Sequence, residues 1–213
     1  MKNISIRSFL GIGLLGVDMA DDAVRVVELR RRRGTLSCRH CGSAALAAGV
    51  MLDGHVEDPQ GLASAVRLAC RNSGSACTRV ALAMPATALI THAIRLPAGL
   101  PEEQLEILVE LEAAQYMPFA LEDASLDFYQ LGPAPPFVGQ TQQEIEVLLV
   151  AARRASVQGR LDAATAAGLT PVVMDSEALA LQAALAQGGW QALPDGGLSY
   201  QLAWGLALHR YAR

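Results

Sequence analysis

The sequence is poor in aromatic residues, contains no long apolar run and shows no excess of basic residues. Phe, Trp and Tyr make up 5% of the 213 residues, so a core must be built mainly from Ala, Leu and Val. The apolar stretches fall far short of the roughly 20 residues that a membrane-spanning helix needs. The formal charge is -4, which argues against a nucleic-acid-binding protein. With 52% hydrophobic residues, the chain is nevertheless too apolar to be disordered.

A secretion signal is not expected at the start of the chain. Lys2 and the apolar stretch from Phe9 to Val17 imitate one, but acidic residues follow at once and no small-residue cleavage site precedes them. A buried strand explains this stretch better. The protein is therefore expected in the cytoplasm, with its four cysteines reduced.

The cysteines include one close pair, Cys38-Arg-His-Cys41, which raises the alternative of a metal or redox site. A zinc ribbon needs a second such pair, and the spacing of Cys70 and Cys77 fits that pattern poorly. If residues 35–42 form a strand, Cys38 and Cys41 point to opposite faces because side chains alternate along a strand. We therefore expect inert thiols and no metal site. The four histidines are scattered and have no paired nucleophile, so a hydrolase has no support.

Apolar periodicity and turn residues predict an α/β chain. Asp58 and Pro59 suit the cap and first position of a helix. Strands are expected at 12–19, 23–30, 35–42, 78–84, 89–96, 125–131, 144–152 and 172–174. Further helices are expected at 101–116, 155–167, 176–187 and, as an amphipathic last helix, 198–211. The basic run Arg30–Arg33 is assigned to a solvated turn, with contact to anionic lipid or a partner as the alternative.

This order of elements predicts mixed sheets and a small subdomain inserted into a core. The segments 11–77 and 153–187 are assigned to the core, and 78–152 to an inserted β-α-β-β subdomain. Residues 188–197 form a turn-rich linker, and 198–213 hold the C-terminal helix.

Four stretches, Leu15–Leu29, Leu111–Phe128, Ala167–Leu181 and Trp204–His209, carry a family resemblance. The most specific motif is Gln-Tyr-Met-Pro-Phe at 115–119, followed by Leu-Glu and a strand that contains an aspartate. In this order they resemble the type IV pilus assembly protein PilM family, which belongs to the actin-like superfamily together with the cell-division protein FtsA. The resemblance implies an actin-like (ribonuclease H-like) lobe. In that family a second lobe with the second phosphate loop and the adenosine pocket lies between the third and fourth stretches, where this chain has only the linker.

The resemblance also implies a degenerate nucleotide site. In the actin-like fold the first hairpin turn cradles phosphate with an Asp-x-Gly pattern and small hydroxyl residues. Here the vestigial loop comprises Gly16, Asp18, Ala20, Asp21 and Asp22, and Glu177 aligns with an acidic residue near the catalytic water and metal. Two carboxylates beside a phosphate are repulsive, by about 4 kcal/mol per charge pair at 4 Å and a dielectric constant near 20. We expect no bound cofactor and no ATP hydrolysis. The alternatives are that Asp21 and Asp22 are ordinary turn residues and that Glu177 only begins a helix.

As for function, the resemblance implies a cytosolic adaptor of the assembly platform of a type IV pilus, or of a related secretion or competence system, held at the inner membrane through a partner. That partner is the cytoplasmic N-terminal tail of a PilN-like inner-membrane subunit, bound in a groove between the core and the inserted subdomain, and other platform proteins are further candidates. Tyr116, Met117, Pro118 and Phe119 are the candidate contacts, unless they only pack the helix end into the core. Loss of the second lobe would expose apolar surface, which favours self-association. The alternative function is an actin-like ATPase subunit whose nucleotide lobe comes from another chain.

Overall fold

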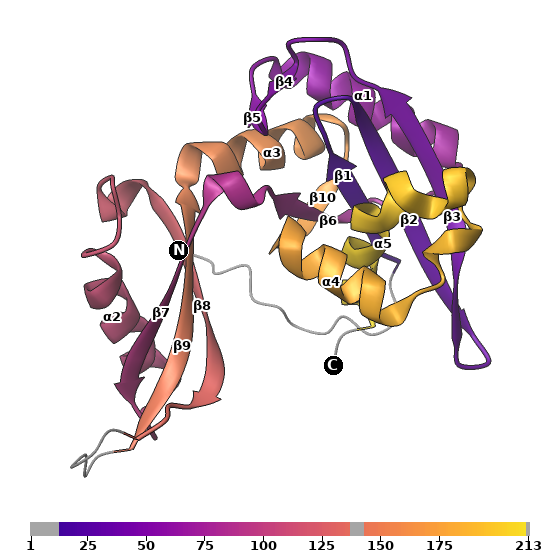
Figure 1. The fold of residues 1–213 in the computed structure, drawn as a ribbon. Coiled ribbons are helices and arrows are strands. Elements are labelled where there is room, and N and C mark those ends of the chain that lie inside the picture. Colours follow the sequence, from indigo (N-terminus) through magenta and orange to yellow (C-terminus); the bar gives the residue numbers. More distant parts are fainter. Residues whose placement is uncertain (1–12, 137–142, 212–213) are drawn as a thin grey trace. The chain divides into compact units, whose positions relative to one another are not determined.

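The computed structural model describes residues 13–136 and 143–211, which form two compact units (Figure 1). One unit joins the described residues up to Thr87 to those from Gln158 onward, and the other comprises Ala88–Val157. None of the helices within the described ranges is long and apolar enough to cross a membrane.

The first unit is built on a five-stranded mixed sheet with the order β10-β6-β1-β2-β3. Strand β1 is antiparallel to β2 and parallel to β6, and β6 is parallel to β10. Every residue of β1 is buried, as expected for a central strand that is covered on both faces. The strands are β1 (Leu15–Met19), β2 (Ala23–Arg32), β3 (Thr35–Ala45), β6 (Arg79–Met84) and β10 (Thr170–Ser176).

Helices cover both faces of this sheet (Figure 1). Helices α1 (Pro59–Ser73) and α3 (Arg154–Ala166) pack their apolar residues with one face, and α4 (Glu177–Gln187) and α5 (Gln201–Ala207) pack with the other. Helix α1 begins as predicted, because the Asp58 carboxylate accepts hydrogen bonds from the N–H groups of Gln60 and Gly61. It ends at Gly74, whose left-handed φ of 69° suits a glycine.

The C-terminal region differs from the predicted amphipathic helix. Helix α5 has only seven residues, and its five residues Ala203–Ala207 are all buried. Two 3₁₀ segments, η3 (Trp190–Ala192) and η4 (Pro194–Tyr200), precede it, and η5 (Leu208–Arg210) follows. Residues 188–197 are therefore part of the folded unit, since Leu193 joins the core around Trp204. The predicted amphipathic helix was wrong because α5 is apolar all around, and a helix of this kind is buried on every side rather than along one stripe.

Two glycines allow α5 to pack at backbone contact. A Cβ atom at Gly16 in β1 would overlap the carbonyl oxygen of Ala203, and one at Gly205 would overlap the carbonyl oxygen of Ala180 in α4. Helix α5 thus lies wedged between β1 and α4, with Trp204 fully buried.

The second unit is a three-stranded antiparallel sheet with the order β7-β9-β8 and one helix. Helix α2 (Glu102–Ala113) packs on one face through Leu105, Val109 and Ala113. The strands are β7 (Leu89–Pro97), β8 (Ala124–Pro133) and β9 (Glu144–Arg153), with a short 3₁₀ segment η2 (Leu121–Asp123) before β8. A β-α-β-β unit is thus present, as the sequence predicted.

Several predicted boundaries need correction. Strand β6 lies between β10 and β1 in the five-stranded sheet and belongs to the first unit. The inserted unit therefore starts at Ala88 and not at residue 78, as predicted. Helix α2 ends at Ala113 rather than 116, and β2 continues to Arg32, so that only Arg33 and Gly34 form the turn. The hairpin of β4 (Met51–Leu52) and β5 (His55–Val56) was not predicted. Residues 137–142 of the predicted β8–β9 loop, and those before Gly13, lie outside the described residues.

Candidate functional site

Asp18 and Glu177, which are 159 positions apart in sequence, come together where β1 and β10 of the first unit's sheet end. Asp18 lies near the end of β1, and Glu177 is the first residue of α4, after the Ser176 cap. Burial raises the pKa of Asp18 to about 7, opposed by Arg25, and the nearby Glu177 carboxylate raises it further. Burial also raises the pKa of Glu177, opposed by Arg160.

Arg160 of α3 is the residue of this cluster that sequence reasoning missed. Its side chain is 2% exposed, and its guanidinium donates to the carbonyl oxygens of Met19 (3.3 Å) and Gly54 (2.8 Å). The carboxylates of Glu177, Asp18 and Asp21 are near enough to oppose the lowering of its pKa by burial. A signal was present in the sequence, because Arg160 is spaced three and four residues from the buried Ala163 and Ala164, on the apolar face of a predicted helix.

Several polar groups of the turn after β1 form hydrogen bonds with other groups of the protein. The Ala20 N–H donates to the Ala23 carbonyl oxygen at 3.2 Å, and Asp21 accepts from the Gly54 N–H at 3.3 Å. Asp22 accepts from Arg25 at 2.6 and 3.2 Å, and Arg25 also lies 3.8 Å from the Asp18 carboxylate. This turn therefore presents two carboxylates, and the Ala20 N–H is already used within the protein. The positive charge near Asp18 and Glu177 comes from the protein itself.

Gly16, which the sequence analysis grouped with the loop, lies within β1, next to its first residue, rather than in the turn. Its lack of a side chain is explained by the close approach of α5 described above.

Asp18 gives a pH-dependent contribution to stability that can be measured. Its ordinary pKa is 3.8 and its folded value is about 7, so the folded state binds the proton more tightly. The contribution is fully present below pH 3.8 and is lost as the pH rises to about 7, with a slope of at most about 1.4 kcal/mol per pH unit. We expect urea unfolding to show this fall in the wild type but not in Asp18→Asn. Parallel curves for the two proteins between pH 4 and pH 8 would refute the shifted pKa.

The candidate partner segment 116–119 follows α2 in the second unit. Tyr116 is 36% exposed, and its ring lies 3.8 Å from that of His92 in β7, centroid to centroid. The Phe119 ring lies beneath the guanidinium of Arg153, 4.4 Å away. Pro118 is exposed, whereas Met117 packs against the hydrophobic core of this unit. The segment thus presents Tyr116 and Pro118 to solvent, while Met117 and part of Phe119 hold its position.

The two cysteines of the Cys-x-x-Cys motif lie on the same face, so the prediction of opposite faces was wrong. The pairing of β2 with β3 shifts by one residue at Arg39, because Glu28 pairs with His40 and Leu29 with Cys38. This bulge reverses the alternation. Both thiols pack against the core around Trp204. Burial, together with Cys41, raises the pKa of Cys38 to about 12, which leaves little of the thiolate that metals and electrophiles require.

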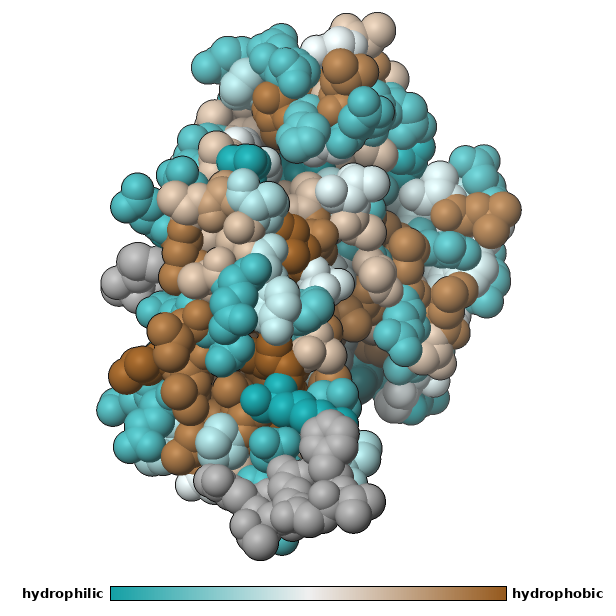
Figure 2. Space-filling model, turned by 60° about the vertical axis from the view of Figure 1, so that its left-hand side comes forward, coloured by the Kyte–Doolittle hydropathy of each residue, from teal (hydrophilic) through white to brown (hydrophobic). Residues whose placement is uncertain are grey.

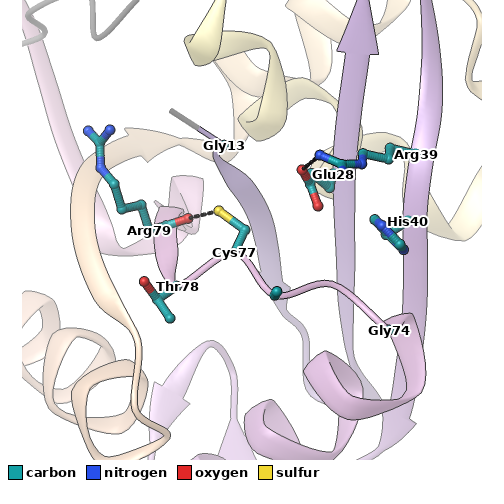
Figure 3. Close-up of a pocket in the computed structure, with 9 residues that line it drawn as sticks. Gly13, Glu28, Arg39, His40, Gly74, Cys77, Thr78 and Arg79 are labelled. Carbon is teal, nitrogen blue, oxygen red and sulfur yellow. Dashed lines mark hydrogen bonds and ion pairs between the residues drawn. The ribbon is translucent and has the colours of Figure 1, made fainter. Parts of the chain in front are cut away.

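The first unit contains a cavity of about 530 Å³ beside β2 and β3, with several polar side chains on its wall (Figure 3). Glu28 on its wall is 3% exposed and accepts hydrogen bonds from Ser75 (2.6 Å) and Arg39 (3.2 Å). The Nδ1 atom of His40 lies 3.2 Å from the Ser73 carbonyl oxygen, and the Cys77 thiol donates to the Arg79 carbonyl oxygen. These groups satisfy one another, so the cavity has the character of a structural polar network. Nowhere in the described ranges do three metal-ligating side chains cluster.

Comparison with known protein families identifies the family of this chain. The model of the family described as type IV pilus assembly protein PilM matches residues 16–211. The chain belongs to the PilM family. The match includes the Asp18 and Arg160 cluster, the second unit and the C-terminal helix, so the resemblance inferred from four short stretches is confirmed over nearly the whole chain.

Solved structures extend this assignment. A chain of a "PilM-PilN type IV pilus biogenesis complex" is 28% identical, with a TM-score of 0.70, and the match covers 81% of this chain and 49% of that one. This PilM-family chain thus spans about half the length of that relative. The expected α/β lobe with a mixed sheet is confirmed, and its fold is similar to that of the PilM-family chain in this complex. Its actin-like (ribonuclease H-like) character stays a prediction.

Two more distant structures match at lower similarity. The cytoplasmic domain of EpsL, an inner-membrane component of the type II secretion system of Vibrio cholerae, is 16% identical with a TM-score of 0.48, covering 79% of this chain and 58% of that one. A protein of unknown function with an actin-like ATPase fold from Bacteroides thetaiotaomicron is 10% identical with a TM-score of 0.38, covering 79% and 53%.

Proposed function

We propose that this chain is a docking module of a type IV pilus assembly platform. It binds the cytoplasmic N-terminal tail of a PilN-like inner-membrane subunit, which holds it at the inner face of that membrane, and it does not hydrolyse ATP. The observation that carries the proposal is the likeness, at a TM-score of 0.70 and 28% identity, to a chain solved as part of a PilM–PilN complex. Over the family match the chain retains both the core unit and the inserted unit.

The segment 116–119 supports the proposal because it offers what peptide recognition needs. Tyr116 and Pro118 are exposed, and their backbone is held in place by Met117 in the core and Phe119 beneath Arg153. A preformed apolar contact loses little conformational entropy when an extended peptide binds to it. Tyrosine in particular supplies a large rigid contact surface.

Truncation of this contact should weaken tail binding. We expect Tyr116→Ala to reduce affinity for a synthetic PilN-like tail peptide by about tenfold or more, the range of a moderate interface contact. The control is Tyr129→Ala in β8, which removes the same side chain from a position that is 67% exposed. Calorimetric titration measures both. If Tyr116→Ala and Tyr129→Ala bound the tail peptide with equal affinity, residues 116–119 would not be part of the binding site.

The absence of ATP hydrolysis is the second part of the proposal. The Ala20 N–H is already bonded to Ala23, carboxylates occupy the turn, and the Arg160 guanidinium lies near Asp18 and Glu177. A triphosphate would meet acidic side chains where phosphate loops supply donors. Calorimetry with Mg-ATP should show no binding.

The alternative is an ATPase subunit completed by another chain, which the proximity of Asp18 and Glu177 would favour. Micromolar Mg-ATP binding by this chain, lost in Asp18→Asn, would support that alternative and overturn this part of the proposal. Self-association stays a prediction, for which the exposed Leu179 and Leu185 of α4 provide apolar surface. Light scattering measures it directly.

A further inference from the structure

Helix α2 has an exposed apolar stripe as well as its buried one. Leu105, Val109 and Ala113 face the sheet of the second unit. On the other side Ile107 is 65% exposed and Leu111 is 66% exposed, and Leu108 between them is half-buried. Residues three and four apart on a helix lie side by side. These three residues therefore form a continuous strip, here called the α2 stripe, extended by the exposed Gln104 and Gln115.

Hydrophobic side chains also gather on the molecular face shown in Figure 2, with hydrophilic ones between them. Large exposed aliphatic residues at adjacent helical positions are the pattern of a partner-binding helix rather than of scattered surface residues.

The charges around the α2 stripe are of one sign. Helix α2 contains five glutamates and no lysine or arginine: Glu102, Glu103, Glu106, Glu110 and Glu112. With 3.6 residues per turn, Glu103 and Glu110 border the stripe on one side and Glu112 borders it on the other. Glu103 and Glu110 are both exposed. An acidic border repels a second copy of the same helix, an anionic membrane surface and nucleic acid, and it attracts a basic partner.

We propose that the α2 stripe is a second docking surface, which takes an amphipathic helix with an apolar face flanked by lysine or arginine. Ile107 and Leu111 supply the apolar contact by packing between side chains of the partner helix. Glu103 and Glu110 select against other partners and set the orientation. This surface shares no residue with the segment 116–119, so the proposal can be tested independently of tail binding.

A designed peptide of leucine, alanine and lysine, with leucine on one helical face and lysine beside it, is the probe. Its match is the same peptide with glutamate in place of lysine. We expect saturable binding of the lysine peptide only, weakened at least about tenfold in the double variant Ile107→Ser/Leu111→Ser. The control variant is Leu131→Ser in β8, which removes an aliphatic side chain that is 50% exposed in the same unit. Circular dichroism verifies that the variants fold.

A charge swap makes the test specific. Glu103→Lys/Glu110→Lys should weaken binding of the lysine peptide and create binding of the glutamate peptide. Glu122→Lys/Asp123→Lys, which reverses two exposed charges on η2, should leave both unchanged. Absence of saturable binding, equal binding of both peptides, or insensitivity to Ile107→Ser/Leu111→Ser overturns the proposal. So does a dimer of this chain that the same double variant abolishes, because the occupant would then be a second copy.

Discussion

Replacing Gly16 with alanine should destabilise the first unit by about 3 kcal/mol. The added Cβ would overlap the carbonyl oxygen of Ala203 and lie 2.7 Å from the backbone nitrogen of Ala207, both in α5 or at its end. Backbone atoms cannot rotate away as a side chain does, so α5 must move off β1. That movement would expose Trp204, which is fully buried. Gly205→Ala should have a similar effect, because its Cβ would meet the backbone of Ala180 on the opposite side of α5.

Urea unfolding followed by tryptophan fluorescence measures this loss, with Trp204 reporting on α5. The matched control is Gly159→Ala in α3, where a Cβ would meet only Val56 at an ordinary 3.6 Å. Alanine favours a helix over glycine by up to about 1 kcal/mol, so the control should be neutral or stabilising. If Gly16→Ala were as stable as Gly159→Ala, the packing of α5 against β1 would be wrong.

Replacing Arg160 with methionine should cost about 3–5 kcal/mol at neutral pH, the range measured when one partner of a buried charge cluster is removed. The carbonyl oxygens of Met19 and Gly54 would lose their donors, and Asp18 and Glu177 would lose a nearby positive charge. The loss should be smaller at pH 5, because the pKa of Asp18 is raised to about 7 and this carboxyl is then protonated.

A double variant separates the charge effect from packing. Asp18→Asn should recover part of the stability in the Arg160→Met background at neutral pH, since the two groups interact. Arg71→Met, at an exposed position in the last turn of α1, is the control and should change stability by less than about 0.5 kcal/mol. A loss that is independent of pH and additive with Asp18→Asn would show that Arg160 acts through packing and its hydrogen bonds to the carbonyls of Met19 and Gly54, and not through its charge.

Most of the strands and helices followed from local chemistry, whereas several of the relations between them did not. Asp58 and Pro59 placed the start of α1, because a cap acts over a few residues. The position of β6 between β10 and β1 depends on pairing between distant segments, which no local pattern contains. The bulge at Arg39 was also invisible, and a single inserted residue reversed the expected directions of Cys38 and Cys41.

The candidate site shows the same division. Asp18 and Glu177 were found through the family resemblance, and the structure brings them together. Arg160 was overlooked because an arginine on a helix is usually solvated, and only the fold shows that α3 directs it towards the carbonyls of Met19 and Gly54. Gly16 was assigned to the nucleotide loop through the family resemblance, although its neighbours are the backbone atoms of α5.

The most direct test of the proposed docking function is calorimetric titration of the whole chain with the synthetic cytoplasmic tail of the PilN-like subunit from the same organism, in the absence of nucleotide. The proposal predicts saturable one-to-one binding that a scrambled tail of the same composition does not show. Binding that is absent without Mg-ATP, or equal for the native and scrambled tails, would contradict it.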